Sequence, residues 1–299
     1  MTEFRMTVGL PFSGISEYAK YLSVCGYRLF DADGLSSEKE KEKRHRDIIR
    51  ALESGVNCVY EGFNLGRRRR RHFLERVRKT GVKTVCDLFV VPVPVLRDRM
   101  KEAGVCEPDV YGMLKEFECP YLNEGFDIVA VHLYAGPCDL EYSREDLMSM
   151  PQDNPNHSLT TGEHEDRAAE YINRNYPYTH CRLFPAAAAR YHDDGKYFSK
   201  TFLDSRGNVS HAAHYYGHEN IGSYLFLLRG YCLKQFAGGD EYRLDGIGIL
   251  YTAYLIGLHM RPMHAWMLSE KAEKRDRRML GEEIYGDLRI LGEADRYGH

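Results

Sequence analysis

Short apolar runs alternate with charged or amphipathic segments through the first 140 residues of the chain. The apolar runs have the length and composition of β-strands and lie at residues 7–10, 27–30, 58–60, 84–91 and 126–134. Helix-like segments lie between them, at residues 18–24, 36–53 and 67–79. Because strands that alternate with helices form parallel sheets, this half predicts an α/β domain with helices on both faces of its sheet.

The strand pattern fades after a polar stretch at residues 141–156, which contains Pro151, Asn154 and Pro155 and is typical of a linker. Beyond it, helix-like segments follow one another at residues 162–175, 181–191, 218–236, 246–258, 269–279 and 282–297. The pattern therefore predicts two domains, an α/β domain at residues 1–145 and an all-α helical bundle at residues 150–299. A chain of 299 residues is long enough to build two such cores.

Charge and cysteine content narrow the classes of function. The chain has 41 Lys and Arg against 44 Asp and Glu, and this net charge of −3 excludes binding of nucleic acid or anionic membrane by bulk positive charge. The longest apolar run, at residues 247–258, is too short to span a bilayer. The eight cysteines are scattered without a CxxC pair, and no signal peptide is evident. We therefore expect reduced thiols, a cytoplasmic location and no membrane partner.

Candidate metal ligands gather in the second half of the chain. His192 and Asp193 are adjacent, so one helix end can supply a nitrogen and an oxygen ligand. Crossing helices of a bundle can bring further ligands to the same point. We expect a metal site from side chains at or near the ends of different predicted helices, namely His164, His192, Asp193, His218, His259 and Asp295. A bridging aspartate could join two ions, and His157 is an alternative to His164 as the first ligand.

The sequence around these residues is more specific than the residues alone. The segments HSLTTGEHEDRAAEYI, AAAARYHDDGK, AHYYGHENIGSYL and LGEADRYGH carry an ordered H…HD…H…H…D pattern. Residues 150–299 therefore resemble the HD-domain phosphohydrolases, which place these ligands on a helical bundle. The resemblance implies that one divalent ion is bound by His164, His192, Asp193 and Asp295. It also implies that His218 and His259 help to bind a second ion, which shares Asp193.

A site of this kind would use one or two divalent ions, from among Mn, Fe, Co, Ni, Zn and Mg, to hydrolyse a phosphomonoester or a cyclic phosphodiester. Asp193 and Lys196 are the expected catalytic residues, with Lys196 placed to pair with a substrate phosphate. Asp194 or Glu219 could orient a ligand imidazole. We expect His264 to be structural, and further substrate contacts could come from His211, His214 and Arg261.

Residues 9–16, GLPFSGIS, lie between a predicted strand and a predicted helix and partly match the phosphate-binding loop G-x-x-x-x-G-K-[ST]. Gly9, Gly14 and Ser16 fit the pattern, but Ile15 replaces the lysine that normally reaches the β- and γ-phosphates. Backbone amides and the start of the following helix could still hold a phosphate. We therefore expect ATP or GTP as the ligand of this loop, bound through Gly9, Ser13, Gly14 and Ser16.

The segments around this loop carry a second resemblance. RLFDADGL, VYEGFNLGRRRRRHFLERVRKTGVKTVCDLFVVP and VCEPDVYGMLKEFECPYLNEGFDIV resemble the P-loop polynucleotide-kinase-like family over residues 4–131. The resemblance implies that Asp33 belongs to the nucleotide site and activates the acceptor hydroxyl. The departures are Ile15, the tetrapeptide EGFN in place of D-A-T-N, and a reduced basic lid that keeps Arg97 and Arg99. They predict a degenerate kinase-like domain that lacks the lysine of an active kinase.

Five consecutive arginines, from Arg67 to Arg71, either begin a solvated helix or contact RNA or DNA phosphates as a local patch. Taken together, these features predict a metal-dependent phosphohydrolase that acts on a nucleotide or a polynucleotide end, with a kinase-like domain in front of it. This substrate class rests on likeness of fold. Two alternatives stay open: a nucleotide- or RNA-binding protein without turnover, and a bifunctional polynucleotide kinase-phosphatase.

Overall fold

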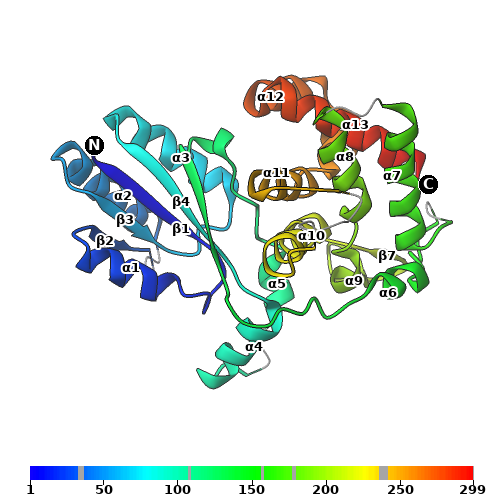
Figure 1. The fold of residues 1–299 in the computed structure, drawn as a ribbon, viewed down its shortest axis with the longest axis horizontal. Coiled ribbons are helices and arrows are strands. Elements are labelled where there is room, and N and C mark those ends of the chain that lie inside the picture. Colours follow the sequence, from blue (N-terminus) through cyan, green and yellow to red (C-terminus); the bar gives the residue numbers. More distant parts are fainter. Residues whose placement is uncertain (33–36, 107–108, 156–157, 177–179, 236–241, 299) are drawn as a thin grey trace. The chain divides into compact units, whose positions relative to one another are not determined.

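The computed structural model describes residues 1–32, 37–106, 109–155, 158–176, 180–235 and 242–298 of the chain. These residues divide into two compact units, which Figure 1 shows as a ribbon. Unit 1 contains Met1–Pro108 and Pro120–Ala135, and unit 2 contains Asp109–Cys119 and Gly136–His299.

Unit 1 is built on a parallel sheet with the strand order β2-β3-β1-β4-β5. The strands are β1 (Glu3–Val8), β2 (Arg28–Asp31), β3 (Cys58–Glu61), β4 (Lys83–Val90) and β5 (Ile128–Leu133). Residues 84–90 of β4 are buried without a break, which is the pattern of a strand covered on both faces. The predicted parallel α/β architecture is confirmed.

Helices lie on both faces of this sheet, as predicted. They are α1 (Ile15–Val24), α2 (Glu38–Glu53), α3 (Arg67–Val77) and α4 (Val93–Glu102). Successive residues of a strand point to opposite faces. On β1, Phe4 packs edge-on against Phe73 of α3 with ring centroids 5.6 Å apart, whereas the next residue, Arg5, donates a 2.8 Å hydrogen bond to Tyr18 of α1. The helices α1 and α3 therefore cover opposite faces.

A polar cluster interrupts the apolar core of unit 1. Asp87, in the middle of β4, is fully buried. One of its carboxylate oxygens, Oδ1, accepts a 2.7 Å hydrogen bond from Arg5 and a 3.1 Å hydrogen bond from the Tyr18 hydroxyl. The same oxygen lies 2.8 Å from Nε2 of His132 on β5. This buried acid therefore has a fixed cation of its own.

Unit 2 is mainly helical. Its helices are α5 (Val110–Leu114), α6 (Arg144–Ser149), α7 (Thr161–Asn175), α8 (His180–Tyr191), α9 (Lys196–Ser199), α10 (His218–Leu227), α11 (Gly246–Ile256), α12 (Glu270–Leu280) and α13 (Glu282–Tyr297). Two π-helical turns are η3 (Leu228–Cys232) and η4 (Pro262–Trp266). The most apolar helix is α11, which packs against α8, α10 and α13, while α7 packs against α8 and α13 (Figure 1).

The prediction that the second half is all-α is wrong in one respect. Strands β6 (Thr201–Leu203) and β7 (Val209–His214) form an antiparallel hairpin. Neither strand was apparent from the sequence, because β6 is short and Val209 of β7 is exposed, so the hairpin shows no clear alternation. The helix predicted over residues 218–236 also ends early, since α10 stops at Leu227 and gives way to the π-helical turn η3.

One segment of unit 2 comes from far earlier in the chain than the predicted domain boundary at residues 145–150. Residues 109–119 pack on α10, where Phe117 meets the ring of Tyr224 edge-on at 5.1 Å between centroids. Asn220 of α10 also donates a 2.6 Å hydrogen bond to the carbonyl of Lys115. Long-range packing therefore assigns these residues to unit 2. Within the described ranges, no helix has both the length and the apolar character needed to cross a membrane.

Candidate metal centre

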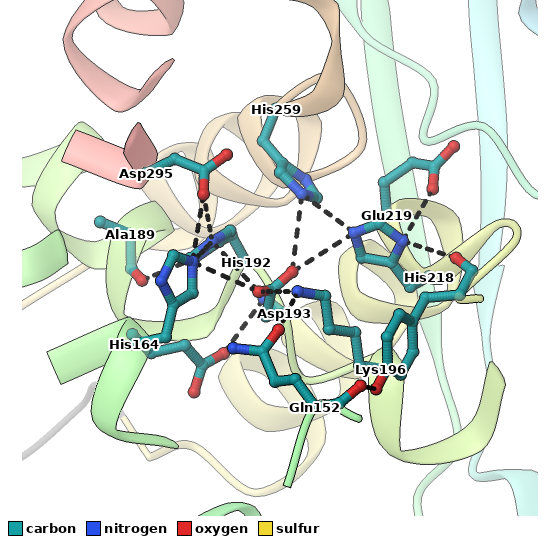
Figure 2. A network of polar contacts seen from close by, with 12 residues as sticks. Gln152, His164, Ala189, His192, Asp193, Lys196, His218, Glu219, His259 and Asp295 are labelled. Atoms are coloured by element: carbon teal, nitrogen blue, oxygen red, sulfur yellow. Dashed lines mark hydrogen bonds and ion pairs between the residues drawn. The ribbon is translucent and has the colours of Figure 1, made fainter. Parts of the chain in front are cut away.

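Five separate elements of unit 2 bring together the side chains predicted to bind metal. One lies in the first turn of α7, two directly follow α8, one begins α10, one lies just beyond α11 and one is near the end of α13. Figure 2 shows them converging on a common centre, with Asp193 in the middle. They are between 0 and 7% exposed, and they are His164, His192, Asp193, His218, His259 and Asp295.

The imidazole rings are oriented by backbone carbonyls. Nδ1 of His192 lies 2.8 Å from the carbonyl oxygen of Ala189, three residues earlier. His218 and His259 repeat this arrangement at 2.7 Å with the carbonyls of the residues three positions before them. Donation of the Nδ1 proton to a carbonyl aims Nε2 at the centre. The local chain thus sets the ring orientation before any ligand is present.

The first cluster lies on one side of Asp193. Nε2 of His164 is 3.1 Å from Nε2 of His192 and 3.1 Å from Oδ1 of Asp295. Oδ2 of Asp193 lies 3.5 Å from Nε2 of each of these two histidines. Two imidazole nitrogens and two carboxylate oxygens therefore face one another across a small space.

The second cluster uses the other oxygen of the same carboxylate. Nε2 of His218 is 3.1 Å from Nε2 of His259. Oδ1 of Asp193 lies 3.3 Å from the first of these nitrogens and 3.8 Å from the second. Each oxygen of Asp193 therefore faces its own pair of imidazoles, as the two sides of Figure 2 show.

These separations fit the coordination sphere of a small divalent ion. Atoms bound to one ion at about 2.1 Å lie about 3.0 Å apart at right angles and about 3.4 Å apart in a tetrahedron. In both pairs the Nε2 atoms meet at 3.1 Å, and because Nδ1 of both His218 and His259 faces a carbonyl, the contact in that pair requires either an extra proton on one ring or a cation between the rings. Two overlapping groups, His164–His192–Asp193 and Asp193–His218–His259, could thus each hold a metal ion.

The charges of the centre are balanced by protons when no ion is bound. Burial alone would lower the pKa of His192, but the charges of Asp193 and Asp295 outweigh it and raise the pKa to about 9. Burial also lowers the pKa of His259, to about 3, and the positive charges of His192 and His218 act in the same direction. Burial would raise the pKa of Asp193, but His192 and Lys196 hold it well below its usual range. A divalent ion would replace the proton on His192.

Lys196 lies in the centre rather than at its edge. Its ammonium nitrogen is 2.6 Å from Oδ2 of Asp193 and donates a 2.8 Å hydrogen bond to Oε1 of Gln152. The side chain is buried beside the ring of Tyr215. Its predicted contact with a substrate phosphate stays a prediction, but the position is close enough to the metal ligands for such a role.

A second layer of polar residues supports the backbone at Asp193. Glu165, which was not singled out from the sequence, is fully buried, and its Oε1 accepts a 3.1 Å hydrogen bond from the backbone N–H of Asp193. Its other oxygen pairs with Arg144. Burial, together with the charge of Asp194, raises the pKa of Glu165 well above its usual range. Its sequence signal is faint, since it merely follows the first histidine of the pattern.

The residues expected to orient the imidazoles do otherwise. Asp194 accepts hydrogen bonds from the hydroxyl of Tyr142 and, at 3.1 Å, from Arg229. Glu219 lies 3.5 Å from Nδ1 of His218, but the closer partner of that nitrogen is the carbonyl of Tyr215. Backbone carbonyls of nearby residues therefore orient the imidazoles, which is the role that the sequence had predicted for these carboxylates.

The remaining candidates of unit 2 are dispersed. Arg261 pairs with the fully buried Asp276, so its guanidinium is held by this acid. His211 and His214 lie on β7, where His214 stacks on Tyr216. His264 lies in η4, and His157, the alternative first ligand, falls outside the described residues.

The predicted phosphate-binding loop of unit 1 connects β1 to α1, as expected. Gly14 adopts a left-handed conformation, with φ of 99°, directly before the helix. Ile15, at the position of the missing lysine, is buried and packs into the core. Ser13 is buried, Ser16 is half-buried, and Gly9 follows the end of β1, while Asp33 falls outside the described residues. Nucleotide binding by this loop stays a prediction.

The five consecutive arginines, from Arg67 to Arg71, lie on different faces of helix α3 because of its periodicity. Arg70 is buried and forms two hydrogen bonds with Glu124, at 2.6 and 2.7 Å, and two more with the carbonyls of Asn64 and Leu65. Arg68 and Arg69 are exposed. Arg70 is therefore a structural residue, and any contact with nucleic acid would fall to its neighbours.

Comparison with known proteins adds no family assignment. A scan against models of known protein families gives no match, and a search of curated proteins gives no significant match.

Proposed function

We propose that unit 2 is a metal-dependent phosphohydrolase with a two-ion centre. The observation that carries this proposal is the position of Asp193, whose two carboxylate oxygens each face a separate pair of imidazoles. Four imidazoles and two carboxylates favour Mn, Fe, Co, Ni or Zn over Mg, which prefers oxygen ligands. When bound, the ions would supply an acidified water molecule and neutralise charge on a phosphoryl oxygen.

The chain contributes orientation and charge to this reaction. The carbonyls that hold Nδ1 of His192, His218 and His259 keep each Nε2 aimed at the centre. The ammonium of Lys196, bound to Gln152 and Asp193, is placed to stabilise negative charge on a phosphoryl group. The buried surroundings strengthen each of these interactions, because they exclude water from around the charges.

A nucleotide or a polynucleotide end is the substrate class that we propose for the centre. The support comes from unit 1, whose parallel sheet places residues 9–14 between β1 and α1 with a left-handed glycine before the helix. Loops in this position hold phosphate groups in many nucleotide-binding proteins. Such a unit, in the same chain as a phosphohydrolase, would bind a nucleotide or a phosphorylated polynucleotide end.

The test combines metal analysis with a screen of phosphomonoesters and cyclic phosphodiesters of nucleosides and short oligonucleotides. We expect copurified metal, phosphate release from part of the panel, and loss of both after dialysis against a chelator. Asp193→Asn should abolish release, whereas Asp204→Asn, in the exposed turn of the β6–β7 hairpin, should leave it unchanged. A metal-free protein that stays inert after addition of Mn, Fe, Co, Ni or Zn would overturn the proposal.

Nucleotide binding by unit 1 without phosphoryl transfer is a second proposed function. The observation that favours it is the buried hydroxyl of Ser13, which has no hydrogen-bond partner among the described residues of its loop and surroundings. Isothermal titration with ATP and GTP tests the idea, and Gly14→Val should weaken binding because a β-branched residue disfavours a positive φ. Transfer of the γ-phosphate to a 5′-hydroxyl end would instead support a working kinase.

A further inference from the structure

Gln152 lies between α6 and α7 and reaches the metal centre from outside the elements that carry the metal ligands. It is 2% exposed, and its Oε1 accepts a 2.8 Å hydrogen bond from the ammonium of Lys196. The same ammonium lies 2.6 Å from Oδ2 of Asp193. Figure 2 shows both groups directed at this nitrogen. The lysine is thus shared between a charged acceptor and a neutral one.

Contacts of the chain around Gln152 fix this residue independently of the lysine. The carbonyl of Gln152 accepts a hydrogen bond from the hydroxyl of Tyr215. The next residue, Asp153, pairs with Lys200 at 2.7 Å, and its carbonyl accepts a 2.8 Å hydrogen bond from the backbone N–H of Ala213. Asp153 has a φ of 47°, a left-handed conformation that a non-glycine residue keeps only where its surroundings hold it. The amide of Gln152 is therefore placed by its own segment.

The groups that hold the ammonium of Lys196 differ in charge. Asp193 offers a carboxylate, whereas Gln152 offers an amide oxygen and Tyr215 offers its ring, whose centroid is 5.3 Å from the ammonium nitrogen. Both uncharged groups attract an ammonium, the amide through a hydrogen bond and the ring through its negative face. These two groups therefore hold the positive charge in place without cancelling it.

Oδ2 of Asp193 is also the oxygen that the first pair of imidazoles faces. It lies 3.5 Å from Nε2 of His164 and 3.5 Å from Nε2 of His192. A divalent cation held by these imidazoles would bind the same oxygen, and its double charge attracts a carboxylate more strongly than an ammonium does. Of the two acceptors of the ammonium, the amide oxygen of Gln152 is then the one that stays with Lys196.

We propose that Gln152 is a positioning residue, which keeps the ammonium of Lys196 at the centre with its charge intact when a cation takes Oδ2 of Asp193. This inference rests on the proposed metal-dependent phosphohydrolase and adds to it a residue that binds neither the ions nor the substrate. The ammonium gives one of its three N–H donors to Gln152, so others stay open to an oxygen of a phosphoryl group. A glutamate in this position would also hold the ammonium, but it would neutralise the charge that attracts the phosphate.

The test measures the binding of Mn²⁺, and then of inorganic phosphate to the loaded protein, by isothermal titration of the full chain. Gln152→Met removes the acceptor but keeps a side chain of similar length. We expect its Mn²⁺ affinity to stay within about twofold of the parent's, and its phosphate affinity to fall by about tenfold. Gln235→Met is the matched control, because the other glutamine of the chain accepts its 2.7 Å hydrogen bond from Arg229 and not from Lys196. This control should bind both ligands like the parent chain.

Two further variants separate positioning of the ammonium from a role in shape alone. Gln152→Glu keeps the size and the acceptor, so it would rescue a residue that only fills space. We expect it instead to lose at least as much phosphate affinity as Gln152→Met, because its carboxylate neutralises Lys196. In the Lys196→Met background, Gln152→Met should cost no further phosphate affinity, since no ammonium is left to position.

The outcomes distinguish this inference from the proposal on which it rests. Phosphate binding by Gln152→Met or Gln152→Glu that equals the parent's would overturn the role of Gln152, and so would a loaded parent chain that binds no phosphate. An equal loss from Gln152→Met with and without Lys196 would overturn it as well. A parent chain that binds none of Mn, Fe, Co, Ni and Zn would instead overturn the metal-dependent phosphohydrolase itself.

Discussion

Each unit of the molecule buries an aspartate among histidine and basic side chains. The two aspartates differ in the groups that surround their carboxylate oxygens. In unit 1, Asp87 is bonded by Arg5, Tyr18 and His132 through one oxygen. In unit 2, Asp193 faces four imidazole nitrogens, and those nitrogens meet in pairs at 3.1 Å. The first acid has a guanidinium partner and no metal-ligand geometry around it, whereas the second pairs with Lys196 and also faces two close pairs of imidazole nitrogens.

The difference separates a structural charge from a candidate site. A buried carboxylate with a fixed cation already has its charge balanced, and breaking the pair costs stability without affecting a ligand. Imidazole nitrogens that face one another around a buried carboxylate need a proton or a metal ion between them. Variants of the two acids and their partners can therefore test whether the distinction holds.

The largest effects are expected from replacing each of the two aspartates by asparagine, one at a time. Asp193→Asn removes the shared charge, so we expect loss of bound metal and a fall of about three orders of magnitude in hydrolysis. Asp87→Asn should keep the metal and the activity of unit 2, but cost unit 1 about 3 kcal/mol because Arg5, which also pairs with Glu3, loses its fully buried partner. Metal analysis and urea unfolding measure both effects. Equal metal loss in the two variants would break the comparison.

Removal of metal should affect the two units differently. Ligand bound to the native state stabilises it by about 3 to 4 kcal/mol when its concentration exceeds the dissociation constant by about 100- to 1,000-fold. We expect a chelator to lower the unfolding midpoint of unit 2, which the fluorescence of Trp266 reports, because that residue is the sole tryptophan. Unit 1, in which Arg5 balances the charge of the buried Asp87, should not respond to the chelator. A Trp266 transition that is the same with and without chelator would contradict a bound ion.

The two cationic partners give a third contrast. Lys196 competes with an ion for Oδ2 of Asp193, so Lys196→Met should bind metal at least as tightly as the parent chain while hydrolysis falls by about 100-fold. Arg5→Met should leave both properties unchanged and destabilise unit 1, because no ion can replace the guanidinium at Asp87. Metal titration together with turnover on the best substrate of the panel distinguishes the cases. Weaker metal binding in Lys196→Met would assign the lysine to support of Asp193 instead.

The sheet of unit 1 was readable from the sequence because strands covered on both faces are continuously apolar, as in β4. The hairpin β6–β7 was not, since its short first strand has no visible period. Residues 109–119 were also missed, because the packing of Phe117 on Tyr224 joins distant parts of the chain and leaves no local mark. Local patterns thus predicted elements better than the packing between them.

The candidate site shows the same limit. The resemblance to an ordered ligand pattern predicted the six side chains that the fold brings together, because each is chemically distinctive. Glu165 escaped notice because it acts on a backbone N–H of Asp193. Arg70 was ambiguous, since nothing within a run of arginines reveals that Glu124, far along the chain, binds this one. Supporting residues are defined by partners that only the fold supplies.

A smaller effect is expected from replacing Glu165, which supports the backbone at Asp193. Glu165→Leu removes both the oxygen that accepts the backbone N–H of Asp193 and the carboxyl group that binds Arg144, so the backbone at Asp193 should be held less firmly. We expect metal affinity to fall by about tenfold, as for other supporting residues of metal sites. Glu170→Leu, on the exposed face of the same helix, is the matched control and should bind metal normally. Equal affinities in the two variants would show that Glu165 does not support the site.

Another buried acid, Asp287 of α13, has neither a guanidinium nor a cluster of imidazoles around it among the residues that the structure describes. It accepts a 2.7 Å hydrogen bond from Tyr251, and burial raises its pKa to about 6. Because the folded-state pKa lies above the ordinary value of 3.8, the native chain favours the protonated acid. This group therefore adds stability as the pH falls from about 6 towards 4, and its charge opposes folding above pH 6.

Asp287→Asn should remove that opposition, since the amide keeps an acceptor for the Tyr251 hydroxyl and carries no charge. We expect a gain of about 1 to 3 kcal/mol in the free energy of unfolding at pH 7.5, shrinking towards zero near pH 4. Urea unfolding in the presence of a chelator, followed by Trp266 fluorescence at several pH values, measures the difference without interference from metal. A loss of stability at pH 7.5 would mean that Asp287 has a cationic partner like Asp87, and a gain that does not change with pH would mean that removal of the charge is not its source. A cationic partner would make Asp287 resemble Asp87 and Asp193, which pair with Arg5 and Lys196, and not a buried acid that burial keeps protonated.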